Sequence, residues 1–436
     1  MRRFLLAGLA LIFVSAQFLP PTAAAPRQPP PRGPLAKPAN LAAYAPDEVL
    51  VAFRPGIRPD VAAQAVGARI SGEIQGLGVH ILKVPPGTVE ATVRAFDRNP
   101  LVEFAEPNGT VYAFVDPDDP YDNTICYPAS DGACVMQWGW SNVRAYDAWA
   151  IVQGSATVKV AVVDTGMDIA WASGLPENTP HEDLGLPCIA SHEGRSWVSS
   201  EPRYIDDHSH GTHVGGTIGA CTNNALGVAG ANWRLHFIVE KTLDFTGSGY
   251  WSWVAKGITD AADRGAKAIN LSLGGSTGSK TLRRAVDYAW NRGAVLVCAA
   301  GNTGNTARSY PAYYTNCLAV AAVDNANQRP SWSTYGSWVE VAAPGVAILS
   351  LMQDQCDWSF MCWWEGYKEG YDSLSGTSMA TAFVTGLAAL IWSTGRCATN
   401  TCVRSIIENN TDPVGTWVSK GRVNFLKALS AAQALP

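Results

Sequence analysis

The stretch TVKVAVVDTG, residues 157–166, is an almost unbroken apolar run that ends on an acidic residue, Asp164. Its valines favour a β-strand, and a strand that is apolar on both faces is typical of a parallel sheet covered on both sides. Four further runs are also short, mostly apolar and rich in residues that favour strands: HFIVEKTLD (236–244), AKAINLSLGG (266–275), GAVLVCAAGN (293–302) and CLAVAAVD (317–324). The repetition predicts one large central sheet.

Helical stretches separate several of these runs, as in YWSWVAKGITDAADRG (250–265) and SKTLRRAVDYAWNRG (279–293). Strands that alternate with helices predict an α/β fold of three layers, with helices on both faces of a mostly parallel sheet. Ligands of such sheets bind beyond the carboxyl ends of the strands. The polar residues that lie at those ends are Asp164, Asn270, Ser272 and Asn302.

Residues 44–115 contain no cysteine and show a second, shorter pattern of predicted strands and helices. The spacing of Val89, Val93 and Phe96 predicts one apolar face of a helix, and alternating apolar residues predict strands around it. The full order is strand, helix, strand, strand, helix, strand, with the other elements at EVLVAFRP (48–55), RPDVAAQAVG (58–67), ARISGEI (68–74), VHILKV (79–84) and LVEFAEP (101–107). This βαββαβ order is the split βαβ, ferredoxin-like arrangement of a small α+β unit. A unit of fewer than about 80 residues has a marginal core, so we expect it to lean on a partner surface.

The first 25 residues have the pattern of a secretory signal. Two arginines precede an apolar run at 4–16, and small residues at 14–16 or 23–25 offer a cleavage site. The apolar run is shorter than the about 18 residues that a membrane helix needs. We therefore expect a secreted protein without a membrane anchor, a signal at 1–25, a proline-rich linker at 26–43 and a large domain at 116–436.

Composition excludes some function classes. Hydrophobic residues make up 47% of the chain and charged residues 16%, as in compact folded proteins. A formal charge of -5 provides no basic surface for nucleic acid or an anionic membrane, so neither is an expected partner.

Ten cysteines, all at or after Cys126, favour disulfides in an exported chain. Ten cysteines allow on the order of a thousand pairings, so counting alone does not give the connectivity. Short spacing suggests the local pairs Cys126/Cys134, Cys356/Cys362 and Cys397/Cys402, which leaves Cys188/Cys221 and Cys298/Cys317.

The stretch SLSGTSMATAFVTG (373–386) places Ser378 at the start of what reads as a buried helix. A serine in that position can be an N-terminal cap. It can also be a nucleophile, because backbone N–H groups and the helix dipole there favour developing negative charge. Both interpretations stay open for the serine by itself.

The stretch HSHGTHVGG (208–216) places His210 directly before Gly211, where a helix is expected to begin. His208, His210 and His213 could also be metal ligands. Exported zinc sites usually show a carboxylate-bearing helix motif such as HExxH, which is absent here. The histidines therefore favour acid–base chemistry over zinc.

Asp164, His210 and Ser378 together supply the groups for nucleophilic catalysis. A serine hydroxyl is a weak nucleophile until a base takes its proton, and that base needs a buried acid to orient it and offset its charge. Asp164 by itself could be only a cap for the following turn. The three residues in combination predict a serine hydrolase.

The same residues lie in motifs through which the chain resembles the subtilases, the subtilisin-like serine proteases. The matching motifs, between about Gln137 and Asn424, are VAVVDTG, SHGTHVGG, INLSLGG, AAGNTGNTA, YPAYY, STYG, VAAPG, SGTSMAT and KGRVN. The resemblance implies a three-layer subtilisin-like fold in which Asp164 orients His210, the general base, and Ser378 is the nucleophile. It also implies an oxyanion hole made of the Asn302 amide and the Ser378 N–H. Subtilases usually carry proline and histidine where this chain has Ala382 and Phe383.

The resemblance further implies how a polypeptide substrate binds. An extended substrate strand would lie between the segments Gly247-Ser248-Gly249 and Ser272-Leu273-Gly274, held by main-chain hydrogen bonds. The pocket for the residue before the cut would be lined by Ala299, Ala300, Gly301 and Ser309. No acid stands at these positions, so we expect a preference for apolar or aromatic residues there.

Calcium is the cofactor that the resemblance implies. The strongest calcium site of thermitase-like subtilases corresponds to the side chains of Asp119, Asp183 and Asn224 and the carbonyls of Cys221, Leu226 and Val228. Oxygen ligands with two carboxylates suit this hard cation. Each acid alone could be an ordinary turn residue. A second acidic calcium loop is not expected, because WVSSEPRYIDDHSH (197–210) lacks most of its carboxylates.

The unit at 44–115 resembles the subtilase propeptide, which assists folding and inhibits the enzyme until it is removed. Self-cleavage is then expected between Tyr112 and Asp118. A permanent domain is the alternative. The stretch LMQDQCDWSFMCWWEGYKEGY (351–371) has no counterpart in the family and reads as an insertion, either a stapled flap or an exposed exosite for partners.

Two other functions are weighed against a broad protease that acts as a monomer. One is an inactive, calcium-stabilised binding protein with the same fold, which the complete set of catalytic residue types disfavours. The other is a processing protease of narrow specificity, which the lack of pocket acids disfavours.

Overall fold

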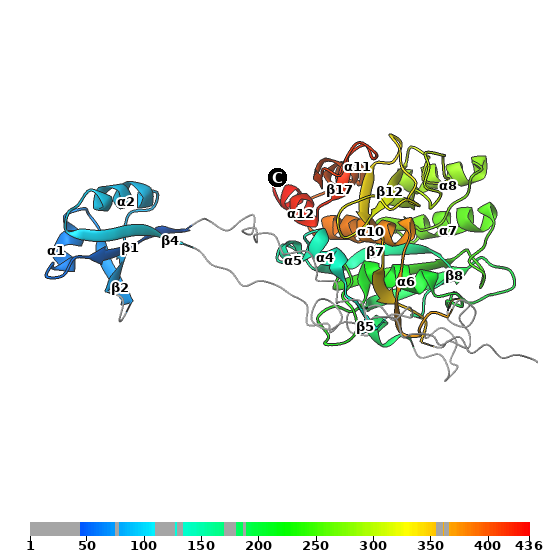
Figure 1. The fold of residues 1–436 in the computed structure, drawn as a ribbon, viewed down its shortest axis with the longest axis horizontal. Helices are drawn as coiled ribbons and strands as arrows, with labels where there is room; N and C mark the ends of the chain where they lie inside the picture. Colours follow the sequence, from blue (N-terminus) through cyan, green and yellow to red (C-terminus); the bar gives the residue numbers. More distant parts are fainter. Residues whose placement is uncertain are drawn as a thin grey trace, which may run out of the picture.

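The computed structural model describes residues 44–74, 78–109, 127–128, 134–169, 180–185, 189–354, 361 and 366–436. They form a small N-terminal unit and a large C-terminal unit, each described here by itself (Figure 1).

The small unit is an antiparallel sheet of four strands in the order β2-β3-β1-β4. Its elements are β1 (Tyr44–Phe53), α1 (Pro59–Gln64), β2 (Arg69–Ile74), β3 (Val79–Lys83), α2 (Val89–Asp97) and β4 (Val102–Gly109). Val89 and Phe96 of α2 are buried against Val49, Val51 and Leu82 of the sheet, as the helical spacing predicted. The predicted order of elements is confirmed.

The large unit is built on a nine-stranded sheet in the order β16-β17-β13-β12-β11-β10-β7-β9-β8. The strands are β7 (Gly154–Asp164), β8 (Ile189–Ser196), β9 (Arg234–Lys241), β10 (Ala268–Leu271), β11 (Val295–Ala299), β12 (Cys317–Val323), β13 (Val341–Pro344), β16 (Thr411–Asp412) and β17 (Gly421–Val423). Neighbouring strands run parallel except β16 and β17, which pair antiparallel. The five strands predicted from apolar runs form its centre.

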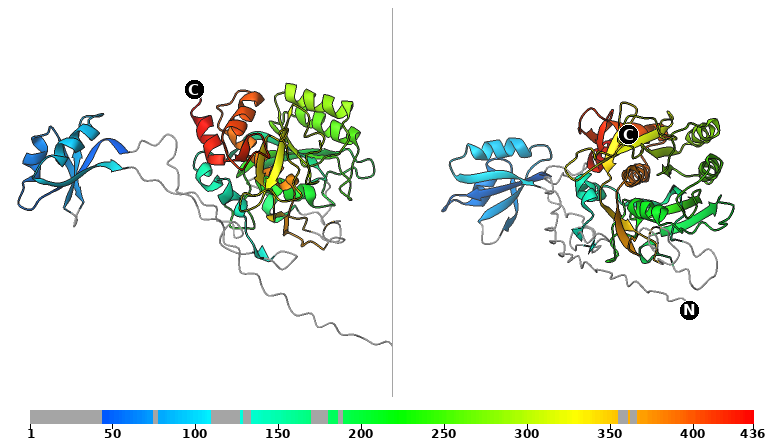
Figure 2. Two further views of the ribbon diagram at one scale, coloured as in Figure 1. Left: turned by 45° about the horizontal axis from the view of Figure 1, so that its top comes forward. Right: turned by 45° about the vertical axis from the view of Figure 1, so that its right-hand side comes forward.

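Helices cover both faces of this sheet (Figure 2). Val160 and Val162 of β7 pack in one core with α6 (His210–Gly219) and α10 (Thr377–Ser393). Ala161 and Val163 pack in a second core with α7 (Trp251–Asp263) and α8 (Lys280–Asn291). Successive residues of a strand point to opposite faces, so one apolar run supplies both cores. This confirms the three-layer α/β fold.

The remaining elements all lie after the small unit, from residue 127 on. They are β5 (Tyr127–Pro128), β6 (Cys134–Val135), α4 (Trp138–Asn142), α5 (Ala145–Trp149), the 3-10 turn η1 (Glu182–Leu184), β14 (Ile348–Leu351), β15 (Tyr371–Leu374), α11 (Asn400–Asn409) and α12 (Phe425–Gln433). Among the described residues, no helix has the length and apolar character to cross a bilayer.

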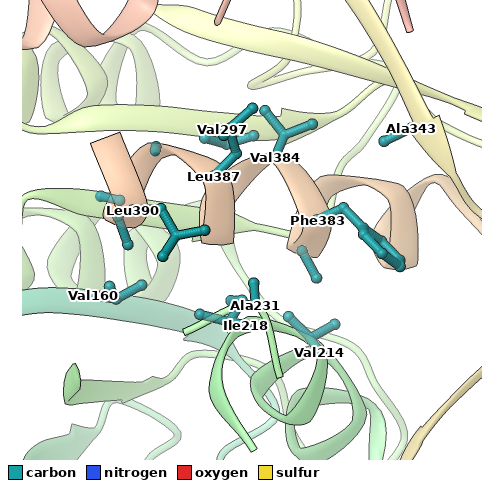
Figure 3. Packing of buried hydrophobic residues seen from close by; sticks show 14 of the residues in the cluster. Val160, Val214, Ile218, Ala231, Val297, Ala343, Phe383, Val384, Leu387 and Leu390 are labelled. Carbon is teal, nitrogen blue, oxygen red and sulfur yellow. The ribbon is translucent and has the colours of Figure 1, made fainter. Parts of the chain in front are cut away.

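Helix α10 is apolar around nearly its whole circumference because it lies in the interior of the large unit (Figure 3). Phe383, which departs from the family pattern, is 2% exposed and its ring centroid lies 4.4 Å from that of Trp140. A Cβ added at Gly139 would lie 2.4 Å from the Phe383 ring. The phenylalanine therefore fits because a glycine leaves room for it.

The described disulfides join Cys298 to Cys317, between β11 and β12, and Cys397 to Cys402. Both agree with the suggested pairs. Cys221 is also disulfide-bonded. Its suggested partner, Cys188, lies outside the described residues. The pairs suggested for Cys126/Cys134 and Cys356/Cys362 lie at least partly outside them too.

Candidate active site

The side chains of the expected site lie at strand ends and helix starts. Asp164 is the last residue of β7, and Asn302 follows β11 in the same parallel sheet. His210 is the first residue of α6, and Ser378 is the second residue of α10. Helix starts leave backbone N–H groups without helical acceptors, so this edge of the sheet offers donors as well as side chains.

Asp164 and His210 form a buried pair. Asp164 is 0% exposed, and its Oδ1 lies 2.7 Å from His210 Nδ1. A carboxylate can only accept, so Nδ1 carries the hydrogen and Nε2 is the basic nitrogen. Burial disfavours the charged imidazolium, but the charge and hydrogen bond of Asp164 outweigh this and raise the pKa of His210. The ring is thus oriented and made more basic.

Ser378 is not the cap of its helix. The N-cap residue of α10 is Gly376, and no side chain caps this helix end. The Ser378 hydroxyl is partly exposed and donates to the carbonyl of Ser272 at 3.1 Å. The capping interpretation is therefore wrong. Transfer of the hydroxyl proton to His210 requires the O–H to turn away from Ser272.

Asn302 is held with a defined amide orientation. Its Oδ1 accepts hydrogen bonds from the backbone N–H of Thr377 at 3.0 Å and from the Thr377 hydroxyl at 2.9 Å. Since both donors face the oxygen, the NH₂ group is the free end of the amide. A Cβ added at Gly376 would lie 3.5 Å from that nitrogen, so the NH₂ group is beside the first turn of α10.

Two adjoining cavities run past these residues. The larger, of about 650 Å³, is lined by His210 together with Gly247, Ser248, Gly249, Ser272, Leu273 and Gly274. The smaller, of about 400 Å³, is lined by Ser378 and Asn302 together with Ala299, Ala300, Gly301 and Ser309. Residues 272–276 line both cavities. The structure thus brings the predicted substrate-binding residues to one cleft with His210, Asn302 and Ser378, and the buried Asp164 contacts His210 from behind the cavity lining.

Sequence reasoning missed several residues of the cleft. His208 and Trp251 line the larger cavity, and Arg308 and Thr334 line the smaller one. The smaller cavity has no acidic residue in its lining. His208 and Arg308 each stand next to or within a quoted motif, a position that could have indicated them.

The expected calcium ligands are brought together in part. Asp183 is 0% exposed, and its carboxylate accepts hydrogen bonds from Asn224 Nδ2 at 2.8 Å and from the backbone N–H of Val228 at 2.9 Å. Cys221 N–H donates to the Asp183 carbonyl at 2.8 Å, which ties both ends of the loop 221–228 to one residue. Asp119 lies outside the described residues.

The amide of Asn224 differs from the expected arrangement. Its nitrogen faces Asp183, and its oxygen accepts from the N–H of Leu226 at 3.0 Å. A carboxylate by itself attracts the NH₂ end of an amide, which accounts for this orientation. The described residues contain no group of three His, Cys, Asp or Glu side chains placed to bind a metal. The buried carboxylate of Asp183 and the amide side chain of Asn224 beside it nevertheless suit an oxygen-ligated cation.

The three histidines weighed as zinc ligands have separate surroundings. His213 is buried and its Nε2 contacts the carbonyl of Ile348 at 2.9 Å, while burial lowers the pKa of His213 to about 3. His210 Nδ1 is engaged by Asp164, and the His208 ring centroid is 6.2 Å from that of His210. These contacts do not direct the three rings at one centre.

The ends of the 351–371 insertion are anchored beside the loop of Asp183. The Tyr371 hydroxyl donates to Glu182 at 2.9 Å, and His181 Nε2 lies 2.7 Å from the Gly370 carbonyl. At the other end, the Asp354 N–H donates to Asp168 at 3.1 Å. Residues 355–360 and 362–365 of the insertion lie outside the described ranges.

Comparison with known proteins agrees with this geometry. The family described as "Subtilase family" matches residues 155–427, and the "Fervidolysin N-terminal prodomain" matches residues 31–108. Thermitase of Thermoactinomyces vulgaris is 42% identical over 72% of this chain and 99% of its own. The thermophilic serine proteinase of Bacillus sp. (strain AK1) is 38% identical over 89% of this chain and 88% of its own. A solved structure described as proteases from Pseudoalteromonas arctica PAMC 21717 aligns with a TM-score of 0.59 at 27% identity, covering 73% of this chain and all of that one (100%).

Proposed function

This chain belongs to the subtilase family, and from that premise we propose that it is a secreted endopeptidase that acts through Asp164, His210 and Ser378. Membership of the family makes the chain a subtilisin-like serine protease with an N-terminal prodomain. The observation that carries the residue assignment is the 2.7 Å contact between the buried Asp164 and His210 Nδ1. It supports Nε2 of His210 as the nitrogen that acts as the base, because Nδ1 is engaged by Asp164.

The proposed reaction begins when His210 Nε2 takes the proton of Ser378. The serine oxygen bonds to the carbonyl carbon of the substrate, and the carbonyl electrons form an oxyanion. The NH₂ group of Asn302 and the N–H of Ser378 donate to that oxyanion. His210 then gives its proton to the leaving amine, and the C–N bond breaks to leave an acyl-enzyme. A water molecule repeats the sequence and releases the acid.

The test is peptide hydrolysis by Ser378→Ala. We expect loss of turnover with an unchanged melting temperature, because the side chain touches the reacting carbon and caps no helix. Ser375→Ala is the matched control, an exposed serine three residues away whose hydroxyl accepts from the Ala347 N–H. Full activity of Ser378→Ala would contradict Ser378 as the nucleophile, whereas no hydrolysis by the folded, activated wild type would support the alternative of an inactive binding protein on this fold.

Substrate recognition is proposed to be strand addition between residues 247–249 and 272–274. This mode needs little sequence in the substrate, because main-chain hydrogen bonds supply affinity. The smaller cavity would hold the residue before the cut. It has no acid and contains Arg308, which supports apolar or aromatic residues there and disfavours basic ones. A narrow processing protease remains the second specificity hypothesis.

Calcium is proposed as a structural cofactor. Asp183, Asn224 and the carbonyls of Cys221, Leu226 and Val228 would hold it, with Asp119 as a further ligand. Calcium there would tie the loop 221–228 to η1 and supply no step of the reaction. For this, the Asn224 amide must present its oxygen rather than its nitrogen to the cation.

The small unit is proposed to be an inhibitory propeptide that the enzyme removes. The prodomain match at 31–108 supports this, and β4 ends at Gly109, close to the expected cleavage between Tyr112 and Asp118. We propose a signal at 1–25, a linker at 26–43, the propeptide at 44–115 and the monomeric catalytic domain at 116–436. The insertion at 351–371 is proposed to be a flap over the core, with an exosite as the alternative.

A further inference from the structure

A buried lysine lies behind the candidate active site. Lys241, the last residue of β9, is 0% exposed. Its Nζ donates to the carbonyl of Thr165 at 2.6 Å and to Asp207 at 2.6 Å, and lies 3.0 Å from Glu201. A charge taken out of water is costly unless it is paired and hydrogen-bonded, and this one has partners in three directions.

The partners of Lys241 lie on the two segments that carry the acid and the base. Thr165 directly follows Asp164, and Asp207 lies in the loop that leads into His210. Strand β9 pairs with β7 up to Lys241 opposite Asp164, so the lysine belongs to the same sheet edge. The ammonium thus connects the carboxyl end of β7 to the loop before α6.

A neighbouring carboxylate makes the same connection from the other side. Asp206 is 0% exposed and accepts from the Thr165 hydroxyl at 2.8 Å and from the Thr212 N–H at 2.8 Å. The Thr165 hydroxyl also accepts from the N–H of Gly211 at 2.9 Å. The residues on either side of His210 are therefore fixed to the residue after Asp164.

Lys241 favours the charged form of both aspartates. Burial raises the pKa of Asp207 to about 7, and the charge and hydrogen bond of Lys241 act against that rise. Burial opposes ionisation of Asp206, but the charge of Lys241 and several hydrogen bonds outweigh it and lower the pKa of Asp206. Burial also opposes the charge of Lys241, but Asp207 and Asp206 raise the pKa of the lysine above its ordinary value. Removal of the ammonium would leave buried carboxylates without their cation.

We propose that Lys241 is a positioning residue for the reaction, whose ammonium group holds the strand end of Asp164 against the loop of His210. It lines neither cavity and touches no reacting atom. The inference rests on the proposed roles of Asp164, His210 and Ser378. If Lys241 only stabilised the fold, its substitution would lower the free energy of unfolding and leave the Asp164–His210 hydrogen bond unchanged.

The test compares Lys241→Met, which removes the charge at similar volume, with Lys241→Arg, which keeps it. All variants are expressed as the full chain and activated alike. We expect Lys241→Met to lower kcat about 100-fold with KM unchanged, because small misplacements of catalytic groups cost rate rather than binding. The downfield proton resonance of the Asp164–His210 hydrogen bond should shift or broaden in Lys241→Met. Lys241→Arg should keep most of the wild-type kcat and a proton resonance close to that of the wild type.

Lys159→Met is the matched control. Lys159 lies on β7, and its Nζ donates to Glu193 at 2.8 Å on a part of the sheet away from both cavities. It should keep the wild-type kcat and resonance. If Lys241→Met does not fold, Asp207→Asn replaces it. This variant should lower kcat several-fold, leave KM unchanged and shift or broaden the same proton resonance.

The proposal is overturned if folded Lys241→Met, or Asp207→Asn in its place, keeps both the kcat and the proton resonance of the wild type. Equal losses in Lys159→Met would overturn it as well. Labelling of wild-type Ser378 by a fluorophosphonate tests the proposed function separately. A labelled wild type with an unaffected Lys241→Met would refute the role of the lysine alone.

Discussion

At the scale of single residues, the site depends on side chains whose orientation is set by neighbours. Asp164 and Ser378 could be singled out from the sequence because each ends or begins a strongly apolar element. The role of Thr377, which turns the Asn302 amide, could not be predicted, because it depends on a contact between residues 75 positions apart. Lys241 was missed for the same reason, since in the sequence it is one lysine at the end of a strand.

Asn302 provides a test of the oxyanion hole. Asn302→Ala should lower kcat by 10²- to 10³-fold, about 2.7–4 kcal/mol, with little change in KM, because its NH₂ group acts on charge that exists only in the transition state. Asn316→Ala is the control, since Asn316 donates to Asp287 outside the cleft. Steady-state kinetics on one peptide would measure both. Equal kcat values for wild type and Asn302→Ala would contradict the assignment.

The pH dependence of activity follows from the Asp164–His210 pair. His210 must be neutral to accept the serine proton, and its pKa is raised by Asp164 above the ordinary value of about 6.5. We therefore expect kcat/KM to rise with pH through a pKa above that value. Asp164→Asn removes the charge that raises the pKa, so its acid limb should move to lower pH, and kcat should fall about 10⁴-fold. A limb that moves to higher pH would contradict this account.

At the scale of elements, the strands and helices that could be predicted are those with a long apolar run or an apolar period. The five central strands and helices α7, α8 and α10 were expected from apolar runs or from the helical stretches between them, and a helix was expected to begin at Gly211 of α6. Strand β8 was not predicted because it is an edge strand with the polar sequence IASHEGRS. Strand β17 has only 3 residues, and its place beside β13 is set by tertiary pairing rather than by its own sequence.

The proposed preference for apolar or aromatic residues before the cut depends on the lining of the smaller cavity. The smaller cavity beside residues 272–276 has no acid to pair with a basic side chain. Reporter peptides that differ only in phenylalanine or arginine before the cut should therefore show a higher kcat/KM for phenylalanine. A strong arginyl preference would refute the proposed pocket. Arg308→Ala should raise the arginyl rate if its charge contributes to the exclusion.

The loop 221–228 carries the calcium prediction. Calcium that binds only the folded protein should stabilise it by about 2.7 kcal/mol at about 100 times its Kd. Chelation by EDTA should thus lower the melting temperature of the wild type, and Asp183→Asn should abolish the difference. Glu182→Gln is the control, since it keeps an acceptor for Tyr371. An equal calcium effect in Asp183→Asn would rule this loop out.

At the scale of the whole molecule, the chain combines a small unit and a large enzyme. The small unit has a core of nine buried residues that includes Val49, Leu82 and Phe96, and the described part of it carries no disulfide. A core of this size is marginal by itself, which is the reason to expect that the unit leans on a partner surface. The division into units could be predicted because its apolar pattern changes from βαββαβ to alternating buried strands and helices. The insertion at 351–371 was identified only by comparison with the family motifs, since no periodicity marks it.

Self-processing should depend on Ser378. The wild type should yield a mature N-terminus between Tyr112 and Asp118, and Ser378→Ala should retain the small unit, because the cut is made by the chain's own serine. N-terminal sequencing of both secreted proteins would show this. Identical mature ends in the two proteins would mean that another protease removes the unit.

The most direct measurement is the site of covalent labelling by a fluorophosphonate, mapped by mass spectrometry of the digested protein. An imidazole that Asp164 holds beside one alcohol should make Ser378 the labelled residue, and His210→Ala should remove the label while the protein stays folded. Labelling of any other serine, or none in a folded and activated wild type, would contradict the account.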